Sequence, residues 1–470
     1  MSDPIVPPDA GDAVVVEGDC LERLRDLPAD SVHAVVTDPP YGLGFMGREW
    51  DRPGLPDDVD ADRRQPYRFQ RWCEAWAAEC YRILRPGGHL LAFGGTRTAH
   101  RLASGIEDAG FEIRDTIAYL YLSGFPKSLD VGKAIDARLG AERTPGPATN
   151  TDCADLRAGR PCRGHGDAGQ RQSGETVHAT PTAPATADAA EWDGWGTALK
   201  PAHEPIVVAR KPLEGTVAGT VLKWATGALN IDGCRVAVAA DDPVHGAVWT
   251  VRDGGPATMN VQPGQDGTRR PATAGTLGRW PANVALDPAA ADALDAQSGD
   301  RSTSSPDEVG AGSGRSSREN GTSEWDVGGT LTVAYGDTGG ASRMLYVAKP
   351  SRAERDAGLP AGNDHPTVKP ATLLRWLVRL VTPPGGIVVD PFAGSGTTGI
   401  AAVCEGMRGV LIERDADYAA IARARIEHAR RYPGEFDPDP DARAAARRAR
   451  EADEARRAAG QPALFDEDAG

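Results

Sequence analysis

The sequence predicts an α/β protein whose parallel sheet is covered by helices on both faces. Short apolar runs typical of buried strands alternate with amphipathic helices near both ends of the chain. A glycine-rich turn at Gly394 comes late, and only one further strand and helix follow it. That is too little to complete such a sheet. We therefore expect the two ends of the chain to build one domain, with the middle third inserted.

The first half of this domain is expected over residues 12–136. Val14 to Glu17 forms a short strand, and Gly18-Asp19 is the turn that follows it. A second apolar run ends at Asp38. The next elements are a helix that Arg85-Pro86-Gly87-Gly88 stops, a strand at His89–Phe93, a helix at Thr98–Ala109, and a strand or strand pair at Phe111–Leu122.

The second half is expected over residues 343–431. A helix that carries Leu373 and Trp376 precedes a strand ending at Asp390. A helix at Thr398–Glu405, a strand at Gly409–Glu413 and a helix over 415–431 complete it. Residues 432–470 form a polar tail with one further helix candidate.

The region between the halves, residues 137–342, has a different composition. Residues 141–190 and 297–320 are poor in apolar residues and rich in Gly, Ser, Thr, Ala and Pro, which is typical of long loops or disorder. Denser pieces lie between them, at Trp195–Pro212, Val221–Val238 and Arg279–Leu286.

The composition sets the class of protein. The chain has 470 residues, is 40% hydrophobic and contains no run of eighteen apolar residues, so we expect a large core and no membrane span. The acidic, proline-rich start does not resemble a signal peptide, and seven scattered cysteines indicate reduced thiols in a cytoplasmic protein. The net charge of −15 argues against nucleic-acid binding but does not exclude it, since a basic cleft can coexist with acidic flanks.

The segment from Asp390 to Thr398 is a strand end, a turn of small residues and a helix start. This geometry lets the backbone approach a ligand closely. Glu413 ends the next strand, where a carboxylate can bind ribose hydroxyls. No Gly-Lys-Ser or Gly-Lys-Thr is present, so a phosphate-binding loop is excluded, whereas the phosphate-free cofactor S-adenosylmethionine fits. The alternative is a structural turn without a ligand.

The tetrad Asp38-Pro39-Pro40-Tyr41 can hold an exocyclic amine. The lone pair of an aromatic amine is delocalised, and acceptors for both N–H groups would localise it. Asp38 and the carbonyl of Pro39 suit that role, the prolines make the turn rigid, and Tyr41 offers a face for a flipped base. The alternative is an ordinary turn with an incidental aromatic ring.

Together these residues resemble the DNA amino-methyltransferases whose catalytic motif precedes their cofactor motif, the beta arrangement. The tetrad matches the catalytic motif, Phe392 to Gly396 matches the cofactor loop, His365 to Pro370 matches the segment leading into the pocket, and Gly18-Asp19 matches an adenine-binding site. The resemblance covers residues 12–136 and 343–431.

The resemblance implies a Rossmann-like methyltransferase sheet, permuted so that the catalytic half comes first, with S-adenosylmethionine as methyl donor and double-stranded DNA as substrate. It implies adenine N6 or cytosine N4 as acceptor, and Asp at the first tetrad position favours adenine. No metal is expected. The implied catalytic residues are Asp38, Pro39, Pro40 and Tyr41, and the implied cofactor residues are Asp19, His365, Thr367, Lys369, Asp390, Phe392, Gly394, Ser395, Gly396, Thr397 and Glu413.

Residues 137–342 fall where this family places its target-recognition region. The stretch from Trp195 to Pro205 resembles a segment of phage-type members. Nearby cations could contact phosphates, although solvated surface charges explain each of them equally: Arg210, Lys211, Lys223 and Arg235. Near the C-terminus, Gln461, Leu464 and Phe465 resemble a peptide that docks on bacterial sliding clamps, with an unstructured end as the alternative.

Other interpretations stay open or are discounted. Cytosine N4 is the nearest rival acceptor, a catalytically silent DNA-binding protein is a rival of another class, and methylation of RNA or of a protein amide is favoured by Asn rather than Asp at position 38. Pro161-Cys162 lacks the surroundings of a nucleophile motif. The spacing of Cys153, Cys162, His165 and His178 is not a recognised zinc pattern.

Overall fold

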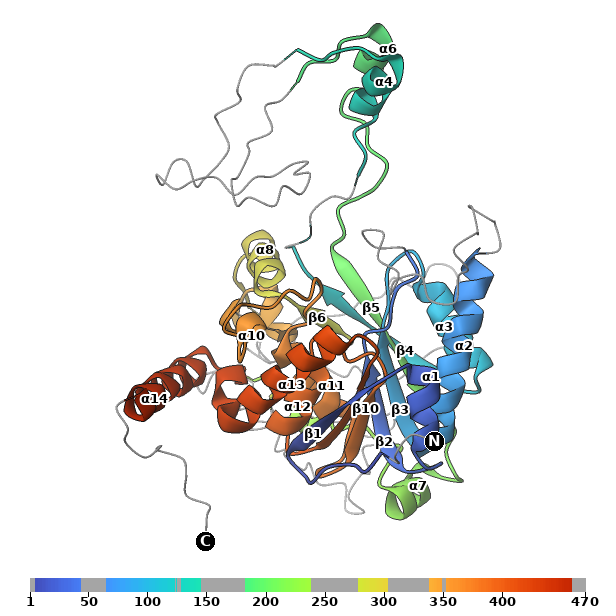
Figure 1. Ribbon diagram of the computed structural model, residues 1–470, viewed down its shortest axis with the longest axis vertical. Helices are drawn as coiled ribbons and strands as arrows, with labels where there is room; N and C mark the ends of the chain where they lie inside the picture. Colours follow the sequence, from blue (N-terminus) through green and yellow to red (C-terminus); the bar gives the residue numbers. More distant parts are fainter. Residues whose placement is uncertain are drawn as a thin grey trace, which may run out of the picture. The chain divides into compact units, whose positions relative to one another are not determined.

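A computed structural model of the protein describes residues 5–43, 65–122, 124, 128–144, 182–237, 278–302, 338–348 and 352–458. The chain divides into two compact units, Ser123–Ala202 and the rest. The larger unit is built on a nine-stranded sheet with helices on both faces (Figure 1). The predicted α/β class with a Rossmann-like sheet is confirmed.

The strands lie in the order β1-β11-β10-β2-β3-β5-β4-β6-β9. Every pairing is parallel except those of β5, which runs antiparallel to both of its neighbours. The bounds are β1 Asp12–Glu17, β2 Val32–Thr37, β3 Leu84–Phe93, β4 Glu112–Leu120, β5 His203–Arg210, β6 Val284–Leu286, β9 Tyr346–Val347, β10 Ile387–Asp390 and β11 Arg408–Glu413.

Strands from the two ends of the chain interleave. β1 pairs along its whole length with β11, from Asp12 opposite Arg408 to Glu17 opposite Glu413. β10 pairs with β11 on one side and with β2 on the other, where Val388 lies opposite Ala34. The expectation that the head and the tail of the chain share one sheet is therefore confirmed.

The central strands are buried on both faces, which explains their continuous apolar runs. Successive side chains point to opposite faces. Val35 of β2 packs in the core under α1–α3, whereas Ala34 and Val36 pack under α11 and α12. The helices on the first side are α1 Cys20–Arg23, α2 Gln65–Ile83 and α3 Ala99–Asp108; those on the second are α11 Ala371–Val381, α12 Thr397–Cys404 and α13 Ala416–Arg431.

The middle of the chain adds strands β5, β6 and β9 to the sheet. β4 and β5 form an antiparallel pair in which Leu120 lies opposite His203, so Ser123–Ala202 leaves and re-enters the sheet at one point. Further elements are α7 Val217–Trp224, α8 Pro288–Ser298, α10 Arg352–Asp356, α14 Pro440–Ala458, the pair β7 Arg301–Ser302 with β8 Thr338–Gly339, and short 3₁₀ turns at Leu24–Asp26, Asp232–Cys234, Ala341–Met344 and Pro433–Phe436. The predicted domain limits stay a prediction.

The smaller unit contains α4 Val131–Leu139 and α6 Ala187–Glu191. Its organising group is the buried carboxylate of Asp136 on α4. This carboxylate accepts hydrogen bonds from the backbone N–H groups of Ala185 and Thr186 and from the Thr186 hydroxyl. Arg143 lies 3.4 Å away as its counter-ion. Hydrogen bonds to the charged form lower the pKa of Asp136 despite the cost of its desolvation.

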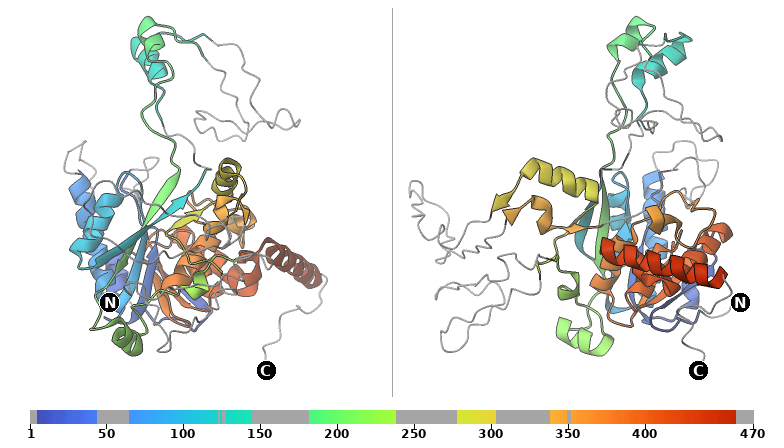
Figure 2. Two further views of the ribbon diagram at one scale, coloured as in Figure 1. Left: turned by 180° about the vertical axis from the view of Figure 1, so that it is seen from behind. Right: turned by 90° about the vertical axis from the view of Figure 1, so that its left-hand side faces the viewer.

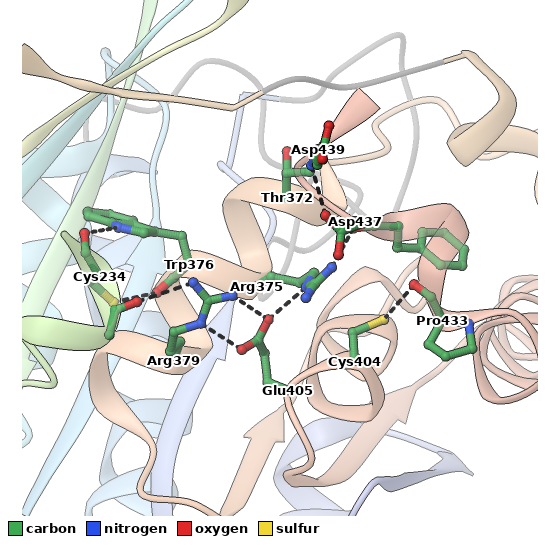
Figure 3. A network of polar contacts seen from close by, with 12 residues as sticks. Cys234, Thr372, Arg375, Trp376, Arg379, Cys404, Glu405, Pro433, Asp437 and Asp439 are labelled. Atoms are coloured by element: carbon green, nitrogen blue, oxygen red, sulfur yellow. Dashed lines mark hydrogen bonds and ion pairs between the residues drawn. The ribbon is translucent and has the colours of Figure 1, made fainter. Parts of the chain in front are cut away.

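Helix α11 is connected to its surroundings by polar side chains (Figure 3). Arg375 and Arg379 both bind the carboxylate of Glu405, the residue after α12, at 2.7 and 2.6 Å. On the other side of the helix, the indole N–H of Trp376 donates to the Cys234 carbonyl at 3.1 Å. The same helix therefore holds both α12 and a segment of the middle region, and it follows directly on the His365–Pro370 segment.

Some predicted boundaries were wrong. β3 begins at Leu84 rather than His89, because Leu84 already pairs with Val32, and an irregularity in the pairing then shifts the register before Ala34. The Pro-Gly-Gly sequence is thus part of the strand, and α2 ends at Ile83. The first helix continues for only one turn before a 3₁₀ turn replaces it.

Several sequence features lie outside the described residues: the cysteines and histidines at 153, 162, 165 and 178, and the tail residues Gln461, Leu464 and Phe465. Among the helices that the structure describes, none is both long and apolar enough to cross a membrane. Figure 2 shows the same elements from two further sides.

Acid should destabilise this fold through buried imidazoles. Burial lowers the pKa of His89 on β3 to about 4, from 6.5 for an ordinary histidine. The unfolded chain therefore binds a proton that the folded chain does not, and stability present above pH 6.5 is lost as the pH falls toward 4. We expect His89→Leu to lose less stability over this window, by up to about 3 kcal/mol.

Urea unfolding of the parent and the variant at pH 7 and pH 4.5 measures this difference. An equal loss of unfolding free energy in both proteins would show that His89 is not responsible. His33, whose pKa is also lowered to about 4 by burial, is unchanged in the variant and contributes equally to both measurements.

Candidate active site

The predicted site residues follow four neighbouring strands at the ends where those strands finish. β1, β11, β10 and β2 are adjacent and parallel. Their carboxyl ends carry Asp19, Glu413, the Asp390 loop and the Asp38 tetrad. In open α/β sheets this edge is where ligands bind. The sheet therefore brings the two distant motifs of the sequence together.

A buried hydrogen bond joins the two motifs directly. The Thr37 hydroxyl, next to Asp38, donates to the Asp390 carboxylate at 2.6 Å. The same carboxylate accepts from the Thr398 hydroxyl at 2.6 Å and from the Phe392 N–H at 3.0 Å. Burial nevertheless raises the pKa of Asp390 to about 6. Asp390 thus connects β2, the cofactor loop and helix α12.

The loop after Asp390 needs glycine at two positions. Gly394 and Gly396 have φ angles of +50° and +78°, which residues with a side chain rarely adopt. A Cβ atom on Gly394 would lie 2.9 Å from Nε2 of His365, and one on Gly396 would lie 2.8 Å from the Ala422 methyl group on α13. The loop is therefore tightly enclosed between α13 and the His365 segment.

A buried arginine forms hydrogen bonds with this loop. Arg425 on α13 is fully buried and donates to the Ser395 carbonyl and to the Thr397 hydroxyl, the latter at 3.2 Å. Its other terminal nitrogen donates to the Glu354 carbonyl at 3.2 Å. Desolvation lowers the pKa of Arg425 to about 10, so it remains charged at neutral pH. The positions of Ser395 and Thr397 are thus fixed by hydrogen bonds from Arg425.

Two carboxylates flank the loop. Glu413 accepts from the Gly394 N–H at 2.7 Å and from the Asp415 N–H at 2.9 Å, and burial raises its pKa. Asp19 follows Gly18, whose N–H donates to the Glu413 carbonyl at 2.9 Å. One Asp19 oxygen accepts from the Leu21 N–H and caps α1. Carboxylate acceptors therefore line the ends of β1 and β11.

The His365 segment closes the other side of the loop. The Thr367 N–H donates to Nδ1 of His365, which places the ring proton of the neutral imidazole on Nε2, toward Gly394. Burial lowers the pKa of His365 to about 4. The ring packs edge-on against Tyr418 at 4.5 Å between centroids. His365 is therefore a neutral wall of the site rather than a base.

Around Asp38 the structure assembles a charged cluster. Tyr41 donates its hydroxyl to Oδ1 of Asp38 at 3.0 Å, and the Lys369 ammonium lies 3.0 Å from Oδ2. Lys369 also contacts Glu204 on β5, at 3.1 Å. The Tyr41 ring lies against Gly95, since a Cβ there would be 2.9 Å from the ring. Pro39 is buried and Pro40 is half-buried between these residues.

Two predicted cofactor residues also contact other parts of the protein. Lys369 places its ammonium on the tetrad, and Phe392 packs its ring between Trp72 and Trp76 of α2, at 5.4 and 5.5 Å between centroids. Thr37, Thr398, Glu204 and Arg425 were not predicted as site residues. Thr37 directly precedes the tetrad, Thr398 ends the Asp390–Thr398 segment and Glu204 lies in the Trp195–Pro205 segment, but the Arg425 contact has no signal in the sequence.

A family model described as DNA methylase matches residues 32–424. Among curated proteins, the chain is similar to the type II methyltransferase M.HindIII of Haemophilus influenzae, with 23% identity over 245 residues, which cover 46% of this chain and 64% of that protein. It is also similar to the DNA adenine methyltransferase YhdJ of Escherichia coli, with 40% identity over 72 residues, which cover 15% of this chain and 24% of that protein. The chain thus matches less than two thirds of the length of either relative.

Two solved structures resemble the fold over most of both chains. The cytosine-N4-specific PvuII DNA methyltransferase has a TM-score of 0.39 and 14% identity, and covers 89% of this chain and 88% of its own. A complex of M1.HpyAVI with SAM has a TM-score of 0.34 and 14% identity, and covers 88% of this chain and 98% of its own.

The Thr37 hydroxyl should be worth measurable stability. Thr37→Val replaces this hydroxyl by a methyl group and leaves the buried Asp390 carboxylate with one donor fewer. Losing a hydrogen bond to a buried charged group costs about 1–3 kcal/mol. We expect the free energy of unfolding to fall by that amount at pH 7, while Thr37→Ser, which keeps the hydroxyl, loses clearly less. Equal losses in both variants would show that packing, not the hydrogen bond, matters here.

Proposed function

We propose, from the premise that this chain belongs to the DNA methylase family whose model matches residues 32–424, that it methylates adenine N6 in double-stranded DNA. The methyl donor of the family is S-adenosylmethionine. The observation that carries the proposal is the Thr37–Asp390 hydrogen bond, which sets the amine-binding tetrad beside the glycine loop.

The tetrad supplies two acceptors for an exocyclic amine. We propose that the target base flips out of the duplex and stacks on Tyr41, and that its amino group donates to the Asp38 carboxylate and to the Pro39 carbonyl. These two bonds draw the amine out of conjugation with the ring and turn its lone pair toward the electrophile. The proton released on methylation passes to Asp38 or to solvent.

The second half of the site suits the donor. S-adenosylmethionine supplies an electrophilic methyl group on a sulfonium and carries no phosphate. The residues around the glycine loop fit such a ligand, because they present carboxylates rather than cations: Glu413 and Asp19 can accept from ribose hydroxyls and an adenine amine. The remaining proposed cofactor residues are His365, Thr367, Asp390, Phe392, Gly394, Ser395, Gly396 and Thr397, with Lys369 at the boundary to the tetrad.

Adenine is the favoured base for two reasons. Asp at the first tetrad position is more frequent in the adenine enzymes that this chain resembles, and YhdJ, one of its relatives, is named a DNA adenine methyltransferase. Cytosine N4 remains the second candidate because the same tetrad can hold either amine. DNA is the proposed macromolecular partner, and docking of Gln461, Leu464 and Phe465 to a sliding clamp is a further proposal from the sequence.

The decisive experiment identifies the methylated nucleoside. Duplex DNA of mixed sequence is incubated with the protein and labelled S-adenosylmethionine at low salt, which compensates for the net charge of −15, and is then digested for mass spectrometry. We expect N6-methyladenine. Asp38→Ala should lower the rate about 100-fold or more, since the amine loses its charged acceptor.

Glu451→Ala, on the exposed face of α14, is the matched control for removal of a carboxylate and should retain activity. N4-methylcytosine as the product would transfer the proposal to the second base. DNA binding with no methyl transfer would favour the silent DNA-binding protein.

Cofactor affinity should depend on Gly394. An alanine there would have to keep a φ of +50° and would bring its Cβ within 2.9 Å of His365. We expect Gly394→Ala to weaken S-adenosylmethionine binding about tenfold or more, as measured by calorimetry without DNA. Gly406→Ala is the control, because Gly406 has a φ of +67° with nothing within 4 Å of the added atom. Equal weakening by both would assign the effect to general destabilisation.

A further inference from the structure

The ammonium group of Lys369 contacts two residues of the tetrad, Asp38 and Tyr41, and also Glu204. They reach Oδ2 of Asp38 at 3.0 Å, Oε2 of Glu204 at 3.1 Å and the Tyr41 hydroxyl at 3.1 Å. Tyr41 in turn donates to the second Asp38 oxygen. Four side chains from three separate parts of the chain thus form a closed network, and none of the three charged side chains is more than 23% exposed.

The cluster is not electrically balanced. Two carboxylates share one ammonium, so with all groups ionised it carries one net negative charge. Burial alone would lower the pKa of Lys369, but Asp38 and Glu204 together raise it well above its ordinary value. Lys369 therefore stays protonated, and its positive charge acts on both carboxylates. Without it, Asp38 and Glu204 would face each other at close range, and like charges in a partly dry site disfavour ionisation.

We propose that Lys369 and Glu204 are positioning residues that together set the orientation of the Asp38 carboxylate and the electrostatic potential at it. The inference rests on the proposed amine methylation. Lys369 holds one oxygen of the Asp38 carboxylate, so that the carboxylate is oriented to accept a hydrogen bond from the target amine, and Glu204 shares the ammonium with Asp38. The potential at Asp38 is therefore less positive than it would be in a simple ion pair with Lys369.

The sheet fixes the position of Glu204, so its contact with Lys369 is part of the fold rather than a chance surface contact. Glu204 lies at the start of β5, the one antiparallel strand of the sheet, opposite Tyr119 on β4. The Lys369 ammonium also lies above the rings of Phe93 and Tyr41, at 5.0 and 5.5 Å from their centroids. Aromatic faces and carboxylates together hold a cation in one position.

Other groups around the cluster could contribute to its titration. Tyr119 and Tyr121 on the β4 side interact electrostatically with Glu204 and Lys369, Asp390 with Asp38, and His365 with Lys369. The tyrosines are neutral at physiological pH because burial raises their pKa, and His365 is neutral because burial lowers its own. Asp390 is unchanged in every variant below.

The experiment compares the pH dependence of kcat/KM for methyl transfer to duplex DNA between pH 5 and 9. Lys369→Met removes the cation, and we expect the pH of half-maximal rate on the acid limb to rise by about one pH unit or more. Lys369→Met combined with Glu204→Gln removes both charges and should bring that pH back toward the parent value. Glu204→Gln alone should move it in the opposite direction, to lower pH.

A purely structural role predicts a different pattern. Lower rates at every pH, with an unchanged acid limb in Lys369→Met or with no return in the double variant, would overturn the inference. Lys369→Gln, which keeps hydrogen-bond donors but no charge, is the second variant should Lys369→Met fail to fold, and it should show the same rise. Circular dichroism and the urea unfolding midpoint verify that each variant is folded. Absence of methyl transfer by the parent protein at any pH would instead refute the proposed function itself.

Discussion

The architecture of the site depends on one buried hydrogen bond, between the Thr37 hydroxyl and the Asp390 carboxylate. It crosses from β2 to β10, adjacent strands whose residues are 353 positions apart in the sequence. Because Asp390 also accepts from Thr398 and Phe392, the same carboxylate fixes the start of α12 and the path of the glycine loop. Movement of one motif relative to the other would remove the Thr37 donor from this buried carboxylate, which is costly.

The second constraint is electrostatic. Carboxylates occur at the end of each neighbouring strand, and each is stabilised differently. Asp390 accepts from hydroxyls, Glu413 from backbone N–H groups, and Asp38 from Lys369 and Tyr41. A site of this kind repels phosphate and favours ligands that bring N–H or O–H donors or a positive charge. The acidity of the site is thus consistent with the proposed amine and sulfonium chemistry, and we expect the proposed contacts with a DNA backbone at other surfaces.

The sequence predicted the parts of this site that follow from local pattern. Apolar runs ending in Asp38, Asp390 and Glu413 located three strand ends, and the small residues of the loop indicated a turn between strand and helix. Long-range contacts were not accessible in the same way. The pairing of Lys369 with Glu204 depends on β5 running antiparallel beside β3, and no periodicity in the sequence reveals which strands are neighbours. The contact of Phe392 with two tryptophans of α2 was not accessible either, because its motif shows nothing of the helix beside it.

The β4–β5 pairing has a consequence for how such a protein can diversify. Leu120 and His203 lie opposite each other in the β4–β5 pairing, so the residues between them connect the two strands as the loop of a hairpin does. A hairpin loop can be lengthened, shortened or replaced at little entropic cost. The pairing of β4 with β5, which positions Glu204, keeps its register. Ser123–Ala202 is therefore a segment that evolution, or an engineer, can exchange without changing the β4–β5 pairing.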